Sequence, residues 1–474
     1  MLDVEKETAL HTPDGVSAEP MPFRDENEEV NPAFVQAAAA AIEASDAERL
    51  RGMVEDFHEA DLGALLQALE PDHRPRLIEL LGRDFDFAAL TEVDDSVREE
   101  ILEELETETV VEGVRELDSG DAVYILESLD EAGKEEILQQ LPAMERVALQ
   151  RSLDYPEASA GRRMQSDLIA VPPFWTVGQT IDFMRETEDL PDTFYEIFVI
   201  DPGGLLLGAV PLDRLLRSKR PVTIAEIMND DPDQVKATDD QEDVARIFER
   251  YNLVSAAVVD ESERLVGVMM VDDILDVLEE EADADIKQLG GVNSEEELSD
   301  TVWDILKSRS TWLFVNLCMA MVSASVIGMF SESLEKMVAL AVLMPIVASM
   351  GGNAGTQTMT VAVRALATRD LGRSNAWRVI RRELIVGALN GIVFATLLAG
   401  VAIAWFGVVD LGPVIGLAIV VTLVSAAFGG ILIPLMLDRF GVDPAISSGP
   451  LVTTITDVVG FFAFLSIATV WFGL

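Results

Sequence analysis

Long uncharged apolar runs dominate the last third of the chain. Four of them contain no charged residue, and a fifth contains only Asp457; the runs are Thr311–Phe330, Met337–Val363, Leu384–Val409, Leu411–Leu437 and Pro444–Leu474. Each is as long as or longer than the ~20 residues with which a helix crosses a bilayer. Buried helices of water-soluble proteins rarely stay uncharged for so long. The pattern therefore predicts a transmembrane domain of five α-helices over residues 309–474.

Short amphipathic helices are the expectation for residues 33–160. Three stretches resemble one another, each with an apolar residue and an acid before a short helix that ends in an Ile/Leu pair and a final Leu: Leu69–Leu81, Val93–Leu105 and Leu129–Leu141. Repeated helical units of this size favour an all-α superhelical N-terminal domain. The first 32 residues are polar, acidic and Pro-containing, without a signal peptide, and predict a disordered acidic tail.

A second repeat, of period 64, follows. Arg163-Met164 matches Ile227-Met228, and the apolar strand Ile197–Asp201 matches Ala256–Asp260. Each copy continues with a second apolar strand and then with a helix that has an acidic residue near its start. We expect two α/β units, over residues 161–222 and 223–286, and then a connecting helix over 287–308.

Charge separates the chain into two very different parts. Residues 307–474 hold 10 of the 34 basic and 8 of the 84 acidic side chains, which leaves 24 and 76 in residues 1–306. Such acidity excludes a nucleic acid partner. One cysteine, Cys318, rules out a disulfide or thiolate zinc site within one chain, and three scattered histidines lack metal-ligand spacing. No nucleophile–base or hydrolase-like metal spacing indicates an enzyme.

The loops between the runs predict the orientation. The loop after the second run carries six arginines, from Arg364 to Arg382, whereas the loop after the third has only Asp410. Positively charged loops stay in the cytoplasm. We therefore expect a multi-pass protein of the cell membrane with a cytoplasmic N-terminus and an outside C-terminus.

Two features do not suit a plain membrane anchor. The second run contains Pro345 and the segment Gly351–Gln357, which weaken a helix; we favour a pore-lining role over the alternative of small residues for close packing. The fifth run contains Asp457 with no Lys or Arg at comparable depth, and Thr453, Thr454 and Thr456 beside it. Such an isolated carboxylate among oxygen ligands favours a hard cation such as Mg²⁺ over a packed neutral acid.

An acid-rich segment runs from Asp272 to Asp285. On a helix Asp273, Asp276 and Glu280 share a face, where like charges repel. A solvated acidic surface and a sensor of divalent ions explain this pattern equally well.

The α/β repeat resembles a tandem pair of CBS domains, a regulatory module. Pro211 and Met270 stand where nucleotide-binding CBS units carry a phosphate-side Ser or Thr, which argues against nucleotide binding. The order of all parts resembles the MgtE family of magnesium transporters. The most specific marks are Pro345–Gln357, Arg364–Asp370, Asp443-Pro444-Ala445 and Pro450–Asp457.

This resemblance implies a homodimer with a Mg²⁺ pore between the copies. It places Asp457 at the pore aspartate, with Thr453, Thr454, Gly449 (where the family has Asn) and Asn353 at neighbouring pore positions. It also implies that cytosolic Mg²⁺ closes the pore through a plug helix near 288–306. The regulatory acids that it suggests are Asp273, Asp276, Glu281, Asp285, Asp443, Asp118 and Asp121.

The leading hypothesis is therefore a magnesium channel or transporter for uptake, closed by intracellular Mg²⁺. A membrane-anchored CBS-domain sensor of ions or nucleotides that does not transport is the alternative, although an anchor does not need Asp457. A chloride channel with CBS domains would place more spans ahead of the CBS pair.

Overall fold

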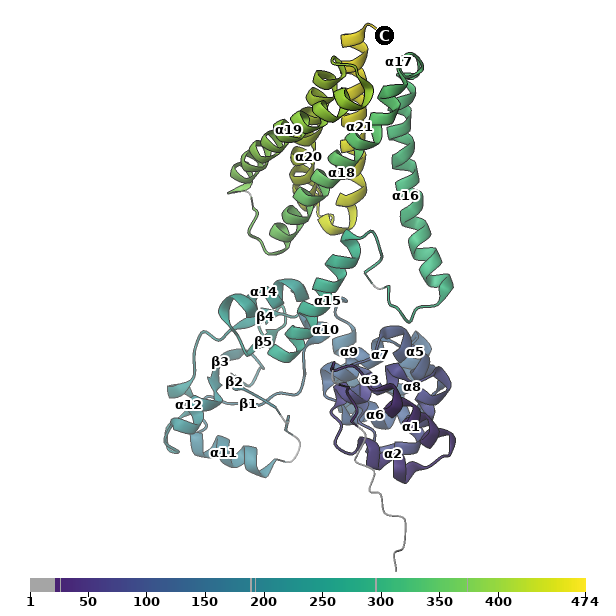
Figure 1. Cartoon of the computed structure of the whole chain (residues 1–474). Coiled ribbons are helices and arrows are strands. Elements are labelled where there is room, and N and C mark those ends of the chain that lie inside the picture. Colours follow the sequence, from purple (N-terminus) through teal and green to yellow (C-terminus); the bar gives the residue numbers. More distant parts are fainter. Residues whose placement is uncertain (1–21, 26, 188–189, 192, 295, 373) are drawn as a thin grey trace, which may run out of the picture. The chain divides into compact units, whose positions relative to one another are not determined.

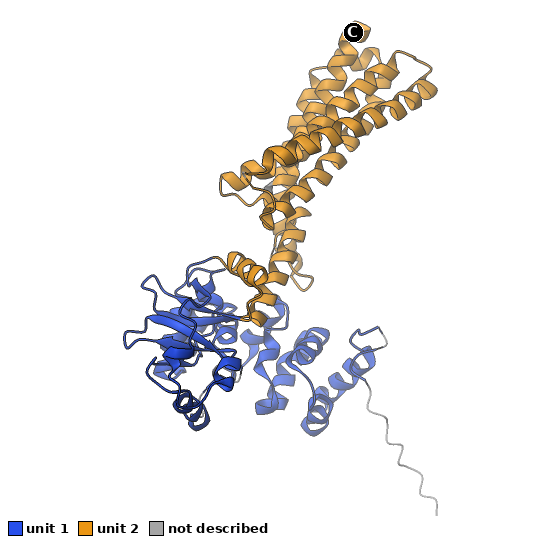
Figure 2. Cartoon of the chain, turned by 90° about the vertical axis from the view of Figure 1, so that its left-hand side faces the viewer, with its two compact units in different colours: residues 1–239, 255–269 blue, residues 240–254, 270–474 orange. Residues whose placement is uncertain are grey.

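The computed structural model describes residues 22–25, 27–187, 190–191, 193–294, 296–372 and 374–474 (Figure 1). The chain divides into two compact units, shown in Figure 2. The first comprises residues 1–239 and 255–269, and the second comprises residues 240–254 and 270–474.

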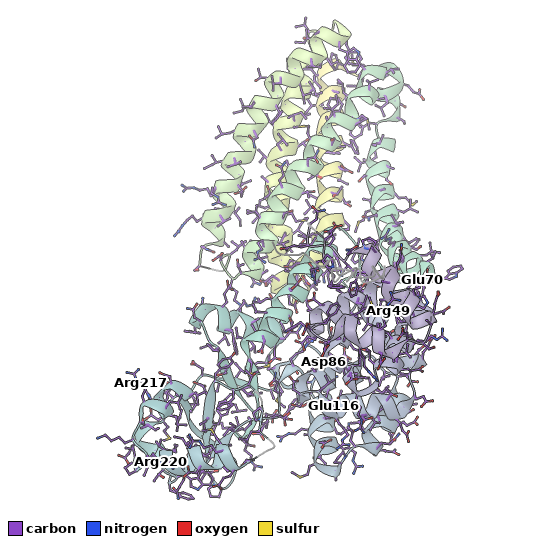
Figure 3. The ribbon with its side chains drawn as sticks, turned by 60° about the horizontal axis from the view of Figure 1, so that its bottom comes forward. Arg49, Glu70, Asp86, Glu116, Arg217 and Arg220 are labelled. Atoms are coloured by element: carbon purple, nitrogen blue, oxygen red, sulfur yellow. The ribbon has the colours of Figure 1, made fainter. Side chains whose placement is uncertain are left out.

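Short helices build the N-terminal part of the first unit. They are α1 (Pro32–Glu43), α2 (Ala47–Val54), α3 (Glu59–Ala68), η1 (Pro71–His73), α4 (Arg74–Leu81), η2 (Gly82–Asp84), η3 (Phe87–Leu90), α5 (Asp95–Glu104), α6 (Thr107–Glu116), α7 (Ser119–Glu127), α8 (Glu131–Gln140), α9 (Ala143–Leu153) and α10 (Ala160–Arg163). One continuous apolar core joins α1 to α9. Charged residues such as Arg49, Glu70, Asp86 and Glu116 are exposed (Figure 3).

A buried arginine at the same position of the first two repeats helps to join each repeat to the helical segment before it. Arg74 and Arg98 each lie five residues after the apolar residue that opens their repeat, and both are buried. The guanidinium of Arg74 donates to the carbonyl oxygen of Leu66, eight residues earlier, and that of Arg98 donates to Leu90, also eight residues earlier. Each arginine therefore satisfies carbonyl groups where the preceding helical segment ends.

The predicted acidic tail differs from the structure in its last part. Phe23 lies against Phe34 and Phe57, with ring centroids 5.4 and 4.6 Å away. Arg24 forms an ion pair of 2.6 Å with Asp61. Residues 22–25 and 27–31 thus pack on the helical domain because an aromatic side chain finds an apolar site there. Residues 1–21 lie outside the described residues.

Two three-stranded sheets follow; the period-64 repeat predicts two strands in each, and the structure adds a third. The first has the order β1-β2-β3 and the second the order β4-β5-β6. The elements are β1 (Ala170–Val171), α11 (Val177–Glu186), β2 (Glu196–Ile200), β3 (Leu206–Pro211), α12 (Leu212–Arg217), α13 (Ile224–Ile227), β4 (Gln234–Lys236), β5 (Ser255–Val259) and β6 (Leu265–Met270). In the first sheet β1 is parallel and β3 antiparallel to β2. Strand β5 is buried along its whole length, which explains its apolar sequence after Ser255.

The second unit begins with α14 (Gln241–Tyr251) and α15 (Val271–Leu289). The helix predicted over 287–308 is wrong, because α15 ends at Leu289 and the chain is not helical from Gly290 to Thr301 among the described residues. Gly291 adopts a φ of 75°, which a helix cannot contain. The segment folds back: Glu296 accepts a hydrogen bond of 2.8 Å from Nε of Arg309.

Five helices in the described residues are long and apolar enough to cross a membrane. They are α16 (Val302–Gly328), α18 (Val338–Ala367), α19 (Ala376–Phe406), α20 (Leu411–Arg439) and α21 (Pro444–Phe472), with the short α17 (Ser331–Lys336) between the first two. Helix α20 is the most buried and packs against α18, α19 and α21, and α16 lies along α21. The fold class predicted from the sequence is thus confirmed in all three parts: a helical domain, two α/β units and five membrane-length helices.

Candidate functional site

Asp457 lies within α21, partly buried and far from either helix end. Helix α21 starts at Pro444 with Asp443 as its N-cap, whose carboxylate accepts from the amide of Ala445 at 2.8 Å. Fourteen residues of helix, about 20 Å, separate Asp443 from Asp457. The described residues give the Asp457 carboxylate neither a hydrogen bond nor an ion pair. An unpaired carboxylate in an apolar helix is stabilised when a cation binds to it.

The threonines next to Asp457 differ in whether their hydroxyl groups are exposed or already hydrogen-bonded to the backbone. Thr454 donates from Oγ1 to the carbonyl of Pro450 at 2.7 Å, and the fully buried Thr456 donates to the carbonyl of Thr453 at 2.9 Å. Thr453 itself is exposed. Helical periodicity places Pro450, Thr453 and Asp457 on one side of α21, and each is at least partly open in a single chain.

The glycines of α18 explain how the helices approach Asp457. A Cβ atom on Gly351 would lie 2.7 Å from Cγ2 of Thr422, and one on Gly355 would lie 2.7 Å from Cγ1 of Val452. A Cβ atom on Gly352 would meet nothing within 4 Å. Close packing therefore accounts for Gly351 and Gly355.

The backbone of this segment is regular helix, although Pro and Gly weaken helices. Helix α18 is continuous from Val338 to Ala367, past Pro345 and all three glycines. Asn353 is exposed, with Nδ2 3.4 Å from Oγ of Ser349, and Gly449 on α21 has open space beside its Cα. Among the proposed pore positions, the structure thus leaves Thr453, Asn353 and Gly449 accessible.

Four acids of α14, α15 and the start of α21 interact electrostatically with one another. Glu281 and Asp285 are one turn apart on α15, and Gln241 on α14 donates to Glu281 at 3.0 Å. Burial raises the pKa of Asp285, and the carboxylates of Asp443 and Glu281 raise it further, while Arg364 opposes them. The part of this shift that comes from Asp443 and Glu281 reflects repulsion between carboxylates, which a divalent cation would relieve.

Glu242 is the member of this group that the sequence did not single out. Burial raises the pKa of its carboxyl, Arg246 lowers it, and Glu281 raises it further. Glu242 stands in a run of five polar and acidic residues that opens α14, so its sequence context resembles an ordinary helix start. Only the packing of α14 near α15 distinguishes it.

The other predicted regulatory acids lie elsewhere. Asp273 accepts from the amide of Met270 at 3.0 Å and so caps α15. Asp276 is exposed. Asp285 is twelve residues beyond Asp273, about 18 Å along the helix. In the first unit, Asp118 caps α7 by accepting from the amide of Asp121 at 2.9 Å. Among the residues that the structure describes, no three His, Cys, Asp or Glu side chains are placed to hold a metal ion.

A polar contact attaches α14 to the C-terminal end of α18 within the second unit. Arg246 donates to the carbonyl of Ala367, the last residue of α18, at 2.7 Å. Asp243 accepts from both Arg246 and Arg369. The guanidinium of Arg246 therefore contacts the negative end of the α18 helix dipole and the carboxylate that it shares with Arg369.

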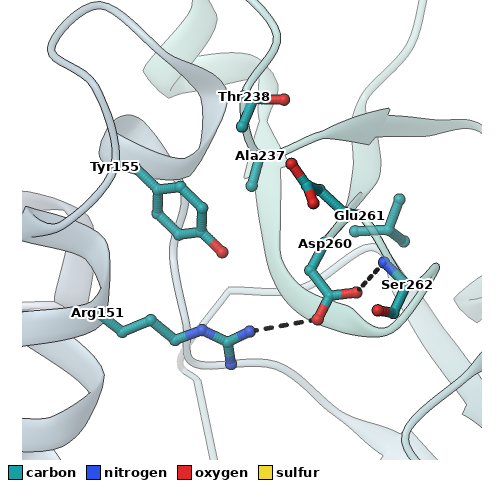
Figure 4. Close-up of a pocket in the computed structure, with 8 residues that line it drawn as sticks. Arg151, Tyr155, Ala237, Thr238, Asp260, Glu261 and Ser262 are labelled. Atoms are coloured by element: carbon teal, nitrogen blue, oxygen red, sulfur yellow. Dashed lines mark hydrogen bonds and ion pairs between the residues drawn. The ribbon is translucent and has the colours of Figure 1, made fainter.

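A surface pocket in the first unit is a poor candidate for an anionic ligand. Figure 4 shows Arg151 directed toward Asp260, with an ion-pair distance of 3.7 Å. Tyr155 and Glu261 also line it. A phosphate there would meet two carboxylates beside one guanidinium.

Comparison with known proteins places these features in a family. The family model for the divalent cation transporter MgtE matches residues 344–467, the MgtE intracellular N domain matches 57–158 and the CBS domain matches 224–280. The magnesium transporter MgtE of Thermus thermophilus is 35% identical over 437 residues, which is 90% of this chain and 96% of the relative. That of Bacillus subtilis is 30% identical over 419 residues, 88% of this chain and 93% of the relative.

Among solved structures, the chain is similar to the cytosolic domain of the Mg²⁺ channel MgtE in complex with ATP. The identity is 30%, and the match covers 51% of this chain and 99% of that one, with a TM-score of 0.48.

Proposed function

The chain belongs to the MgtE family of divalent cation transporters, and on this basis we propose that it carries Mg²⁺ across the cell membrane past Asp457. The observation that supports this most is the Asp457 carboxylate, which lies deep in a membrane-length helix without a partner among the described residues. Mg²⁺ keeps several waters and needs few direct carboxylates. The exposed hydroxyl of Thr453 would contact such a hydrated ion.

Two copies of the chain would enclose this path. Within one chain, α16, α18 and α20 pack against α21. The side of α21 that bears Thr453 and Asp457 stays partly open. An ion path needs walls on every side, and a twofold axis beside α21 would place two Asp457 carboxylates around one cation. We therefore include a homodimer in the proposal, with the N-terminus in the cytoplasm and the C-terminus outside.

Intracellular Mg²⁺ would close this path through the acids of α14, α15 and α21. Glu242, Glu281, Asp285 and Asp443 repel one another when α15 approaches the start of α21. A bound divalent cation removes that repulsion and so favours the packed arrangement, which we assign to the closed state. This feedback would limit uptake when the cytoplasm is rich in Mg²⁺.

Flux through the purified full-length protein tests the proposal. Liposomes that contain the protein and a Mg²⁺-sensitive dye should take up Mg²⁺ faster than protein-free liposomes. Mg²⁺ on the side of the acidic half should slow that uptake. If liposomes with correctly folded protein take up no more than empty ones, the chain is instead a membrane-anchored sensor.

A further inference from the structure

The cytoplasmic end of α19 presents basic residues to its surroundings. Arg378 and Arg381 are exposed, and neither has a carboxylate partner among the described residues. Arg382 differs, because it pairs with Glu383 at 3.0 Å. In a chain with 84 acidic and 34 basic residues, neighbouring arginines without an acid are unexpected. Trp377 precedes them with 74% of its surface exposed.

This basic end lies on the side of α19 that faces away from the other helices. Gly387 and Gly391 form the packed side, since a Cβ atom on them would lie 2.8 Å from Cβ of Ala427 and 3.1 Å from Cα of Val420, both on α20. With 3.6 residues per turn, Arg378 points away from these glycines, and Arg381 points to the side between them and Arg378. The described residues of the second unit therefore offer no carboxylate to neutralise them.

The same side of the helix turns apolar within one further turn. Ile385, Leu389 and Ile392 follow the arginines on it, and more than half of each is exposed, at 51%, 59% and 58%. Large apolar side chains exposed on a membrane-length helix face lipid tails. Arg381 is only four residues, about 6 Å, from Ile385, which sets the two arginines at the depth of the phosphate groups.

We propose that Trp377, Arg378 and Arg381 at the cytoplasmic end of α19 bind the headgroup of an anionic phospholipid. A guanidinium donates two parallel hydrogen bonds to phosphate oxygens, and an indole ring settles at the level of the headgroups. The anionic charge is the specific element, since zwitterionic lipids carry their own cation, which two unpaired arginines would repel. This inference depends on membrane insertion of α19 and not on Mg²⁺ transport.

Lipid retention by the full-length protein tests this site. The protein is exchanged into bilayer nanodiscs of phosphatidylcholine mixed with phosphatidylglycerol, and native mass spectrometry counts the lipids that stay bound after release. We expect a preference for phosphatidylglycerol in the unchanged protein. The double variant Arg378→Gln/Arg381→Gln should lose roughly tenfold or more of that preference, given the contribution of each basic residue near an anionic surface. The double variant Arg217→Gln/Arg250→Gln, which neutralises two exposed arginines of the acidic half, should retain it.

Quenching of Trp377 locates the bound lipid. Brominated phosphatidylglycerol should quench the part of the fluorescence that Trp377→Phe removes, more strongly than brominated phosphatidylcholine does, and added salt should reduce the difference. Equal quenching by the two lipids, or an unchanged preference in the Arg378→Gln/Arg381→Gln variant, would overturn the proposal. So would a Trp377 signal that neither lipid quenches, because a second copy of the chain would then cover this end of α19.

Discussion

At the scale of single residues, Asp457 stands apart because its surroundings are apolar and its charge is unmatched. A carboxylate at the centre of a membrane helix costs about 2.5–3.5 kcal/mol on insertion scales. The five apolar runs contain no Lys or Arg at its depth, so an internal ion pair does not offset this cost. The position is understandable if a transported cation visits it. The sequence alone was sufficient to find this residue, because a single charge in a run of 31 residues is conspicuous.

Glu196 on β2 provides a pH test away from the proposed ion sites. Burial raises the pKa of its carboxyl, and Asp233 raises it further, while a hydrogen bond with Ser255 opposes both. The folded state thus binds a proton more tightly than the unfolded state, so the stability of this region rises as pH falls through the raised pKa toward 4.5. Glu196→Gln should slow hydrogen exchange of the β2 amides at neutral pH, with a gain that shrinks on acidification.

Glu226 serves as a control, because its pKa is shifted in the opposite direction. Hydrogen bonds from Thr223 lower the pKa of its carboxyl, so the stabilisation it provides is present at neutral pH and lost as pH falls below 4.5. Glu226→Gln should therefore speed local exchange at neutral pH or leave it unchanged. Slower exchange in Glu226→Gln, or faster exchange in Glu196→Gln, would contradict these assignments.

Residues that matter through distant contacts could not be found from sequence. Glu242 looks like an ordinary acid at a helix start, and 39 residues separate it from Glu281. Asp243 and Arg369 are 126 residues apart in the chain, yet they form an ion pair. In a chain so rich in acid, residue type carries little information about which carboxylates interact. Which carboxylates interact is decided by how the helices pack in the folded structure.

At the scale of elements, close approach of α18 to α20 and α21 depends on two glycines. Gly351 and Gly355 lie four residues apart on one side of α18, where neighbouring side chains leave no room for a methyl group. This contact sets the distance between α18 and the part of α21 that carries Thr456 and Asp457. The segment thus acts mainly as a packing surface, with Gly352 and Asn353 on a more open side.

Alanine at these glycines tests the packing. Gly351→Ala and Gly355→Ala should each destabilise the membrane helices by about 1–3 kcal/mol, because the added methyl group overlaps Thr422 or Val452. Thermal unfolding of the purified full chain measures this, and Mg²⁺ flux should fall as the helices separate. Gly352→Ala is the matched control and should change neither quantity. Equal effects of all three substitutions would argue against the packing role.

Hydropathy predicted the membrane helices well but not the connection that leads into them. The ends of the second, fourth and fifth runs fall within a few residues of the ends of α18, α20 and α21, because long apolar runs leave little choice of structure. The start of α16 was missed by nine residues, since Val302–Ser310 is charged and extends the helix beyond its apolar part. The connecting helix failed at Gly290-Gly291, where a positive φ ends α15.

At the scale of the whole molecule, the second unit joins a CBS helix to a membrane helix. Arg246 on α14 holds the carbonyl of Ala367, and Asp243 accepts from Arg369 just beyond it. Any movement of α14 therefore acts on the cytoplasmic end of α18. In the proposed cycle this contact would transmit the state of the acids around Glu281 to the helices that line the ion path.

Removing this contact should weaken regulation without blocking transport. For Arg246→Gln combined with Arg369→Gln, we expect half-closure of the path to need at least about fivefold more Mg²⁺ on the side of the acidic half, the lower end of typical allosteric couplings. Maximal flux should stay the same. Arg250→Gln, an exposed arginine on the same helix, is the control. An unchanged Mg²⁺ dependence in the double variant would show that α14 does not act through α18.

The most direct measurement is Mg²⁺ flux through liposomes reconstituted with Asp457→Asn, compared with Asp410→Asn. Both substitutions remove one carboxylate, but Asp410 is exposed at the start of α20 rather than within a helix. We predict that Asp457→Asn abolishes or severely reduces flux while the protein stays folded, and that Asp410→Asn retains it. Undiminished flux through folded Asp457→Asn would contradict a Mg²⁺ path past this residue.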